Sequence, residues 1–385
     1  MRNSRRGSVD PFIVMDVMEE ARRLEEAGRS IVHMEVGQPG TPAPEGARAR
    51  VAEAMAQGAL GYTVSLGLPA LRQRIAALYG DWYGVDLDPG RVVVTNGSSG
   101  AFLLAFTAFL DAGDRMALGT PGYPSYRQIL RALDIEAVEI PAADENRLQL
   151  VPGDLAGVDY QGLLVASPGN PTGTMLDRDA LAALIADAQG RGACFFSDEI
   201  YHGIEYERKA VSALEISDEV CVINSFSKYF SMTGWRIGWM VVPEDRVRHV
   251  ERLAQNMFIC APHVSQVAAL GALDSIEELE ANRAVYAANR KRMIDGLPAA
   301  GFDRIAPPDG AFYVYADVSE LTDDSRALAS EILNEAGVAV TPGLDFDPER
   351  GARTLRFSYA QGTAEIEEGL ARLTDFMARR GPGKA

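Results

Sequence analysis

The sequence predicts an α/β fold in which a mostly parallel central sheet is covered by helices on both faces. Short apolar segments recur along the chain and alternate with stretches of helical spacing, as expected for strands that are buried on both sides. Polar or aromatic residues directly follow these segments. Because the carboxyl ends of parallel strands meet at one edge of a sheet, where ligands bind, we expect a functional site along that edge.

The elements follow in chain order. Residues 15–27 have helical spacing, and residues 31–36 form a strand that ends at Gly37. Another strand, 355–358, lies near the C-terminal end, after a strand at 311–315 that follows a Pro-Pro-Asp-Gly turn. The strands expected to form the large sheet, each ending in polar or aromatic groups, are residues 91–96, 116–119, 163–167, 193–197 and 220–224.

We expect two domains. Residues 46–275 contain the strands of the large sheet and form the larger domain, and residues 10–45 and 276–385 together form a smaller α+β domain. With 385 residues and 47% hydrophobic content, the chain is long and apolar enough to bury a core of this size.

Composition limits the partners and the compartment. The net charge of −17 disfavours a nucleic-acid or anionic membrane surface as partner. No apolar segment approaches the length of a membrane span or a signal core, and two of the three cysteines lie in apolar strand-like segments, which indicates buried thiols in a reducing compartment. The histidines lack metal-ligand spacing. We therefore expect a cytoplasmic protein without a metal site.

Lys228 follows the apolar residues 220–224 and the motif 225–227. Burial of this segment would desolvate the lysine ammonium and lower its pKa, which leaves a neutral amine able to form a Schiff base with an aldehyde. A solvated surface lysine is the usual alternative. Arg236 and Ser225 lie nearby in sequence, and a guanidinium can hold a phosphate in a fork. An aldehyde combined with a phosphate indicates pyridoxal 5′-phosphate (PLP).

Ser98 and Ser99 lie in the motif 97–100, between a predicted strand and a helix expected to begin at Ala101. The free N–H groups and the dipole of a helix N-terminus favour phosphate binding. Taken alone, this motif is better explained as a glycine turn with serine caps. The position of Ser225 and Arg236 on the same expected edge favours the phosphate site.

Asp198 and Tyr201 end the strand at residues 193–197. A carboxylate beside a pyridinium nitrogen keeps it protonated and makes the ring an electron sink, and a tyrosine hydroxyl can bond the phenolic oxygen. The alternative is a helix-capping aspartate. Asn170 fits either the same phenolic oxygen or a tight turn, and Tyr123 fits either a ring that stacks on the cofactor or a packed core aromatic.

Arg356 lies in the apolar strand 355–358. Since arginines are seldom buried without a partner, a substrate carboxylate held by two parallel hydrogen bonds is the natural explanation. Arg353, three residues earlier, is expected on the opposite face of that strand, in solvent.

These motifs, together with Val-Gly-Gln-Pro at 36–39, Tyr-Thr-x-x-x-Gly at 62–67 and Gly-Trp-Arg-Ile-Gly at 234–238, resemble those of the class I and II aminotransferases. The chain is most similar to the aspartate aminotransferase-like branch of these fold type I PLP enzymes. The resemblance runs from about Asp10 to the C-terminal helix. It implies a transaminase of amino-acid metabolism that moves an amino group between an L-amino acid and a 2-oxo acid.

The resemblance also implies the roles of single residues. Lys228 would be the Schiff-base lysine and proton shuttle, Asp198 would pair with the pyridine nitrogen, and Tyr201 and Asn170 would bond the phenolic oxygen. The implied phosphate ligands are Ser98, Ser99, Ser225 and Arg236, and the implied carboxylate ligands are Gly37 and Arg356. Tyr62 would reach the phosphate of the neighbouring subunit's cofactor, which implies a homodimer with shared active sites.

Two departures leave the substrate open. Many aspartate-specific members carry tryptophan at the position of Tyr123, and residues 255–262 lack the arginine with which some members bind a second carboxylate. An apolar or small amino acid is therefore as plausible as aspartate. A PLP-dependent lyase, for example of the carbon–sulfur β-elimination type, would use the same lysine, aspartate and arginine. A regulatory module on this fold is disfavoured by the complete catalytic set.

Overall fold

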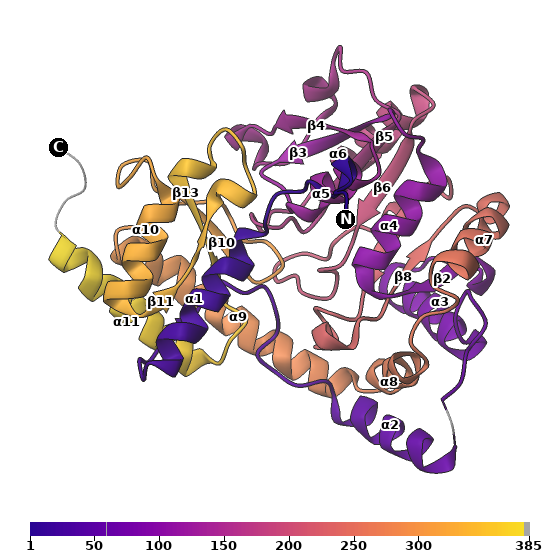
Figure 1. Ribbon diagram of the computed structural model, residues 1–385, viewed down its shortest axis with the longest axis horizontal. Coiled ribbons are helices and arrows are strands. Elements are labelled where there is room, and N and C mark those ends of the chain that lie inside the picture. Colours follow the sequence, from indigo (N-terminus) through magenta and orange to yellow (C-terminus); the bar gives the residue numbers. More distant parts are fainter. Residues whose placement is uncertain (59, 381–385) are drawn as a thin grey trace.

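The computed structural model describes residues 1–58 and 60–380, and its larger part is built on a seven-stranded sheet (Figure 1). The strand order is β2–β8–β7–β6–β5–β3–β4, and only β8 runs antiparallel to its neighbours. The mostly parallel α/β fold is thus confirmed. The strands are β2 (Val92–Thr95), β3 (Arg115–Thr120), β4 (Glu136–Pro141), β5 (Gly162–Ala166), β6 (Cys194–Asp198), β7 (Cys221–Ser225) and β8 (Gly238–Val241).

Helices cover both faces of this sheet. The sheet has a hydrophobic cluster on each face. In β5, Leu163 and Val165 belong to one cluster and Leu164 belongs to the other, so this strand is apolar along its whole length. The first cluster contains residues of α3 (Pro69–Tyr83), α6 (Arg178–Gly190) and α8 (His263–Leu273), against which α2 (Glu45–Gln57) packs. The second contains residues of α4 (Gly97–Phe109), α5 (Ser125–Ala132) and α7 (Val247–Met257).

The two flanks of the chain form a smaller part beside the large sheet (Figure 1). It holds an antiparallel sheet of order β12–β13–β10–β9 and the parallel pair β1–β11. Its strands are β1 (Val32–His33), β9 (Arg304–Ile305), β10 (Tyr313–Asp317), β11 (Val338–Ala339), β12 (Thr341–Pro342) and β13 (Thr354–Ser358). Its helices are α1 (Ile13–Glu26), α9 (Ile276–Ala299), α10 (Ser325–Glu331) and α11 (Thr363–Arg380).

Several predicted boundaries were wrong. The helix expected from Ala101 already begins at Gly97, so the two serines lie in its first turn. The strand expected at 31–36 is limited to two residues, and the strand expected at 311–315 is shifted to β10. Arg353 is exposed, as expected, but it lies in the turn Gly351–Arg353, because β13 begins only at Thr354.

β4 and β8 were not among the expected strands. In the part of the chain that the structure describes, no helix is both long enough and apolar enough to cross a membrane.

Candidate active site

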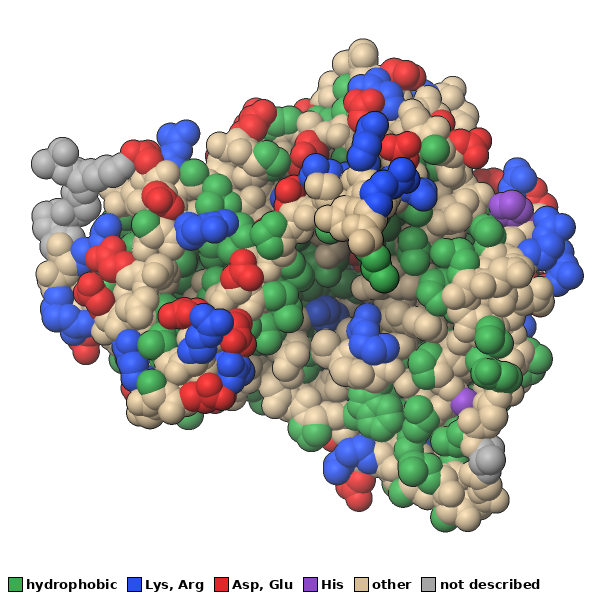
Figure 2. All heavy atoms as spheres, viewed as in Figure 1, with side chains coloured by type: hydrophobic (Ala, Val, Ile, Leu, Met, Phe, Trp, Pro, Cys, Tyr) green, Lys and Arg blue, Asp and Glu red, His purple; other side chains and the backbone are tan. Residues whose placement is uncertain are grey.

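A cavity of about 280 Å³ lies where the carboxyl ends of the large sheet's strands face the smaller sheet. The face of the molecule in Figure 2 is hollowed near its centre, and hydrophobic side chains border the hollow. The cavity is lined by every predicted site residue except Ser225 and Tyr62. The cavity therefore brings together predicted groups that lie far apart in sequence: Gly37, Ser98, Ser99, Tyr123, Asn170, Asp198, Tyr201, Lys228, Arg236 and Arg356.

The side chain of Lys228 lines the cavity shortly after the end of β7. Its Nζ donates a hydrogen bond of 2.5 Å to the carbonyl oxygen of Gly37 and lies 5.6 Å from the ring centroid of Tyr201. Burial is the main cause that lowers the pKa of Lys228 to about 7, and the positive charges of Arg356 and Arg236 lower it further. Much of this lysine is therefore a neutral amine near pH 7.

Asp198 is the last residue of β6 and is 3% exposed. One carboxylate oxygen accepts a hydrogen bond from the hydroxyl of Tyr126, and the other accepts one of 3.1 Å from the backbone N–H of Ile200. Burial raises the pKa of Asp198 to about 6, and these hydrogen bonds and Lys228 oppose the rise. Asp198 is therefore ionised at neutral pH, beside an amine that is partly uncharged.

Tyr126 and Tyr313 are site residues that the sequence did not reveal. The hydroxyls of Tyr201 and Tyr313 are 2.7 Å apart, which joins the end of β6 to β10 of the smaller sheet. Burial raises the pKa of Tyr201 and that of Tyr313, so both phenols stay protonated at neutral pH. Tyr313 lies in an apolar segment and Tyr126 lies at a buried position of the amphipathic helix α5, so the sequence pattern of each is that of a core aromatic.

Ser98, Ser99 and Arg236 form one end of the cavity. Gly97 opens α4 with φ +69°, and a Cβ at this residue would collide with the guanidinium of Arg236. Arg236 itself has a positive φ of 50°, a strained conformation for a residue with a side chain. A helix N-terminus and a guanidinium thus meet closely, and this donor set suits a phosphate.

Ser225 is 1% exposed, and its hydroxyl is bonded to Ser227 Oγ at 2.9 Å and to the carbonyl of Ile237 at 3.2 Å. Ser227, not Ser225, lines the cavity at this end. Ser225 and Ser227 share one motif, and nothing in the sequence distinguishes the serine that reaches the cavity.

Arg356 lies on β13 and is 2% exposed. One Nη donates to the side chain of Asn170 at 2.9 Å and the other donates to the carbonyl of Glu35, while the guanidinium carbon lies 4.5 Å from the ring centroid of Tyr313 and 4.8 Å from that of Phe346. Its Nε has no acceptor among the described residues. A buried guanidinium held in this way suits an incoming carboxylate.

The remaining wall of the cavity is apolar and comes from the N-terminal flank. Phe12, Val14, Met15 and Met18 line it, and the ring of Phe12 meets that of Tyr123 edge-on at 5.9 Å. The only lysine or arginine side chains lining the described cavity are Lys228, Arg236 and Arg356. The cavity thus combines the amine of Lys228, the guanidinium groups of Arg236 and Arg356, and an uncharged wall.

Tyr62 lies outside this cavity and is 83% exposed. The structure contains one chain, so the predicted contact of Tyr62 with a neighbouring subunit stays a prediction.

The chain is similar to known proteins in sequence and in structure. A sequence model described as Aminotransferase class I and II matches residues 29–373. The chain is 46% identical over 378 residues to the valine–pyruvate aminotransferase of Mycobacterium tuberculosis, covering 97% of each chain, and 32% identical to the aspartate aminotransferase of Thermotoga maritima, covering 98% of this chain and 100% of the relative. A crystal structure from Silicibacter pomeroyi superposes with a TM-score of 0.95 at 72% identity and covers 99% of this chain and 100% of that one.

Proposed function

The chain belongs to the class I and II aminotransferases and is a transaminase, and from that premise we propose that it binds PLP in the cavity around Lys228. The family is PLP-dependent, and the chain's own groups fit this cofactor. Lys228 offers an amine for the aldehyde, Asp198 a carboxylate for the ring nitrogen, and Tyr123 a face for the ring. The close approach of Gly97 to Arg236, together with Ser98 and Ser99, fits the phosphate. Ser225 would act at this end through Ser227.

When bound, PLP supplies an aldehyde that takes up the amino group and a ring that accepts electrons from the substrate's α-carbon. Asp198 holds a proton at the ring nitrogen, since a buried carboxylate favours the charged pyridinium beside it. Lys228 moves a proton to and from the α-carbon, because its lowered pKa leaves Nζ near neutrality at working pH. Tyr201 and Asn170 orient the ring through its phenolic oxygen.

The substrate's α-carboxylate is assigned to Arg356, with Gly37 beside it. Both the amino acid and the 2-oxo acid carry this group, so one arginine serves both halves of the reaction. Its orphaned Nε supports this role.

For the side chain we propose a small aliphatic amino acid such as valine, with pyruvate as a 2-oxo acid. The uncharged wall of Phe12, Met15 and Met18 would leave a second carboxylate unpaired, which is costly. The relative named as a valine–pyruvate aminotransferase supports this choice. The lyase alternative has no support among the relatives.

The observation that carries the cofactor proposal is the buried, partly neutral amine of Lys228 facing Asp198 and Arg236. Purified protein should absorb visible light, and borohydride reduction should leave the cofactor attached to the peptide that contains Lys228, as detected by mass spectrometry. Lys228→Ala that retains normal transamination would overturn the assignment.

A substrate panel tests the proposed specificity. Valine, alanine, leucine, aspartate and glutamate are assayed with pyruvate and with 2-oxoglutarate. We expect kcat/KM for valine to exceed that for aspartate by about tenfold or more, because an unpaired carboxylate costs at least about 1–3 kcal/mol to bury. Equal values for the two amino acids would overturn the specificity and leave the cofactor assignment intact.

We also propose a homodimer in which Tyr62 reaches the phosphate of the neighbouring subunit's cofactor. Exposed apolar side chains around it support a contact surface: Tyr62 is 83%, Val64 58% and Ile259 50% exposed. Ser65 Oγ donates to the carbonyl of Ile259 at 2.6 Å, so the segments that carry these side chains adjoin.

Two further proposals concern organisation and compartment. The separation of the seven-stranded sheet from the four-stranded sheet and the β1–β11 pair supports a division into a large domain, 46–275, and a small domain formed by 10–45 and 276–385, of which residues 381–385 lie outside the described chain. The free thiols of Cys194, Cys221 and Cys260 support a reducing compartment, namely the cytoplasm.

A further inference from the structure

Residues 343–350, here named the docking loop, connect β12 to the turn before β13 and contact several segments that line the cavity. The backbone N–H of Gly122, next to Tyr123, donates to the carbonyl of Phe346 at 2.9 Å. The ring of Phe346 lies under the guanidinium of Arg356. The carboxylate of Asp345 accepts a hydrogen bond of 3.3 Å from the backbone N–H of Val14, at the start of α1. One loop therefore touches the ring end, the carboxylate end and the apolar wall of the cavity.

Arg350 fastens this loop to the large sheet. Its Nη atoms donate to the carbonyls of Ala142 at 3.0 Å and Thr120 at 2.9 Å, which lie just after β4 and at the end of β3. Its Nε donates at 2.7 Å to Asp347, which is 1% exposed and also accepts the backbone N–H of Arg350 at 2.9 Å. All three guanidinium nitrogens are thus used in charge-assisted hydrogen bonds.

The position of Thr120 gives these bonds a consequence at the active site. Thr120 is followed by Pro121, Gly122 and Tyr123, so the guanidinium holds the start of the segment that carries the ring-facing tyrosine. Four residues before Arg350 in the docking loop, Phe346 supports Arg356. The spacing between Tyr123 and Arg356 therefore depends on how the docking loop lies against β3.

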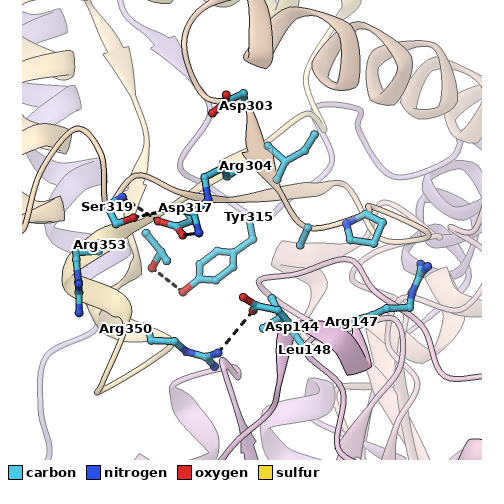
Figure 3. Close-up of a pocket in the computed structure, with 14 residues that line it drawn as sticks. Asp144, Arg147, Leu148, Asp303, Arg304, Tyr315, Asp317, Ser319, Arg350 and Arg353 are labelled. Atoms are coloured by element: carbon cyan, nitrogen blue, oxygen red, sulfur yellow. Dashed lines mark hydrogen bonds and ion pairs between the residues drawn. The ribbon is translucent and has the colours of Figure 1, made fainter. Parts of the chain in front are cut away.

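Arg353 provides a natural comparison. Both arginines border a second cavity of about 570 Å³, away from the candidate active site (Figure 3). In Figure 3 Arg350 reaches toward Asp144, at 3.8 Å, while Arg353 points elsewhere. The guanidinium of Arg353 forms no hydrogen bond or ion pair with any residue in 1–58 or 60–380. Arg350 and Arg353 thus carry the same charge and border the same cavity, but only the guanidinium of Arg350 is hydrogen-bonded to described residues.

We propose that Arg350 is a positioning residue for transamination: it holds the docking loop on the ends of β3 and β4 and so fixes Arg356 relative to Tyr123. This inference rests on the proposed roles of Arg356 and Tyr123. A purely structural Arg350 would affect stability alone, whereas a positioning residue also affects the binding of carboxylates and of the cofactor.

The test compares Arg350→Ala with Arg353→Ala and the parent protein. The measurements are KM and kcat for valine and pyruvate, the dissociation constant of isovalerate (an unreactive carboxylate) from the holoenzyme, the dissociation constant of PLP from the apoprotein, and the thermal midpoint. For Arg350→Ala we expect KM, the isovalerate constant and the PLP constant to rise about tenfold, since the charge-assisted hydrogen bonds that hold the docking loop are lost. Arg353→Ala should change none of them by more than about twofold.

The inference would be overturned if KM, the isovalerate constant and the PLP constant of Arg350→Ala all stayed within twofold of the parent's values and only its thermal midpoint fell. If Arg350→Ala does not fold, Arg350→Lys is judged by the same criterion, since a lysine can satisfy only part of the three-way contact. Arg356→Ala distinguishes the proposed function of Arg356 from the positioning role of Arg350. If it leaves isovalerate binding unchanged, the proposed function of Arg356 fails; if it abolishes binding while Arg350→Ala does not weaken it, only the positioning role fails.

Discussion

Lys228 and Asp198 have pKa values that burial moves toward each other, to about 7 and about 6. Desolvation disfavours the charged form of each group, so it lowers the pKa of the lysine and raises that of the aspartate. Above both values the lysine is a neutral amine and the aspartate is ionised, and both are the forms that the proposed chemistry requires. Below both values neither group is in that form.

PLP uptake by the apoprotein should therefore depend on pH. We expect the rate at which the visible band appears to rise between about pH 6 and pH 7 and to level off above about pH 8, because Lys228 loses its proton over this range. Stopped-flow absorbance measures this rate, and Lys228→Ala should show no such band. A rate that falls as the pH rises would contradict the assignment of Lys228.

Tyr126→Phe should weaken the active site without removing a group that contacts substrate. The hydroxyl of Tyr126 stabilises the ionised form of Asp198, so its loss should raise the pKa of Asp198 further and move the acid limb of the kcat/KM profile to higher pH. At neutral pH we expect kcat/KM to fall about tenfold, because the variant lacks a hydrogen bond to a charged group.

Tyr160→Phe is the matched control, because its hydroxyl also donates to a carboxylate, that of Asp187 at 2.7 Å, away from the cavity. If both variants have the parent's pH profile, Tyr126 does not tune Asp198.

Single residues were predictable where a motif had more than one unusual feature. Lys228 and Arg356 are charged residues in apolar surroundings, and the sequence alone indicated a partner for each. Tyr126 and Tyr313 could not be separated from packing aromatics, since only the fold brings one hydroxyl to Asp198 and the other to Tyr201.

Among the elements, α4 is the one whose first residue matters most. Gly97→Ala should reduce PLP affinity by about tenfold or more, because alanine is strained at φ +69° by about 1 kcal/mol and its Cβ would displace the guanidinium of Arg236. Fluorescence titration of the apoprotein measures this affinity.

Gly113→Ala controls for backbone strain alone. Gly113 has φ +93°, and nothing lies within 4 Å of an added Cβ. This variant should lose stability and keep PLP affinity. Equal affinity losses in the two variants would show that the collision with Arg236 is unimportant.

α1 supplies the apolar wall, and its role can be tested by shortening one side chain. Met18→Ala should raise KM for valine by about fivefold to tenfold, since it removes apolar contact area of about 40–60 Å² at roughly 25 cal/mol per Å². Aspartate, which gains nothing from this wall, should be affected less. Val285→Ala, on an exposed side chain of α9, is the control. An equal effect on valine and aspartate would count against the wall as a side-chain subsite.

The elements of the large sheet were more predictable than those of the smaller part. A strand buried on both faces, such as β5, is apolar along its whole length and stands out in the sequence. β1 and β11 are two residues each and pair with each other. The local pattern indicated a longer strand at 31–36 in place of β1 and did not indicate β11, because the extent of both strands is set by their pairing. β8 was missed because its first residue, Gly238, is also the last residue of the motif 234–238, which contains the predicted phosphate ligand Arg236.

At the scale of the whole molecule, the exposed apolar surface around Tyr62 is the main feature that one chain leaves unexplained. We expect two-fold symmetric dimers in which each site is completed by the neighbouring Tyr62. Mixing Lys228→Ala with Tyr62→Phe should then produce hybrid dimers with one native site, and activity should recover partly, because the other site of each hybrid carries both defects.

Subunit exchange is checked by native mass spectrometry, and each variant alone gives the baseline. An active monomer, or no recovery despite demonstrated exchange, would contradict the shared site.

The parallel pair β1–β11 has a consequence for how this protein is made. Val32 pairs with Val338, and the backbone N–H of Met34 bonds the carbonyl of Ala339 at 3.0 Å, so strands from opposite ends of the chain depend on each other. A ribosome releases the first of these strands long before the second, whereas the whole seven-stranded sheet emerges in between. The nascent protein therefore can assemble the lysine end of its cavity early, whereas Gly37 and Arg356 can come together only after both flanks of the chain have been made. We expect the part of the site that binds the substrate carboxylate to form last.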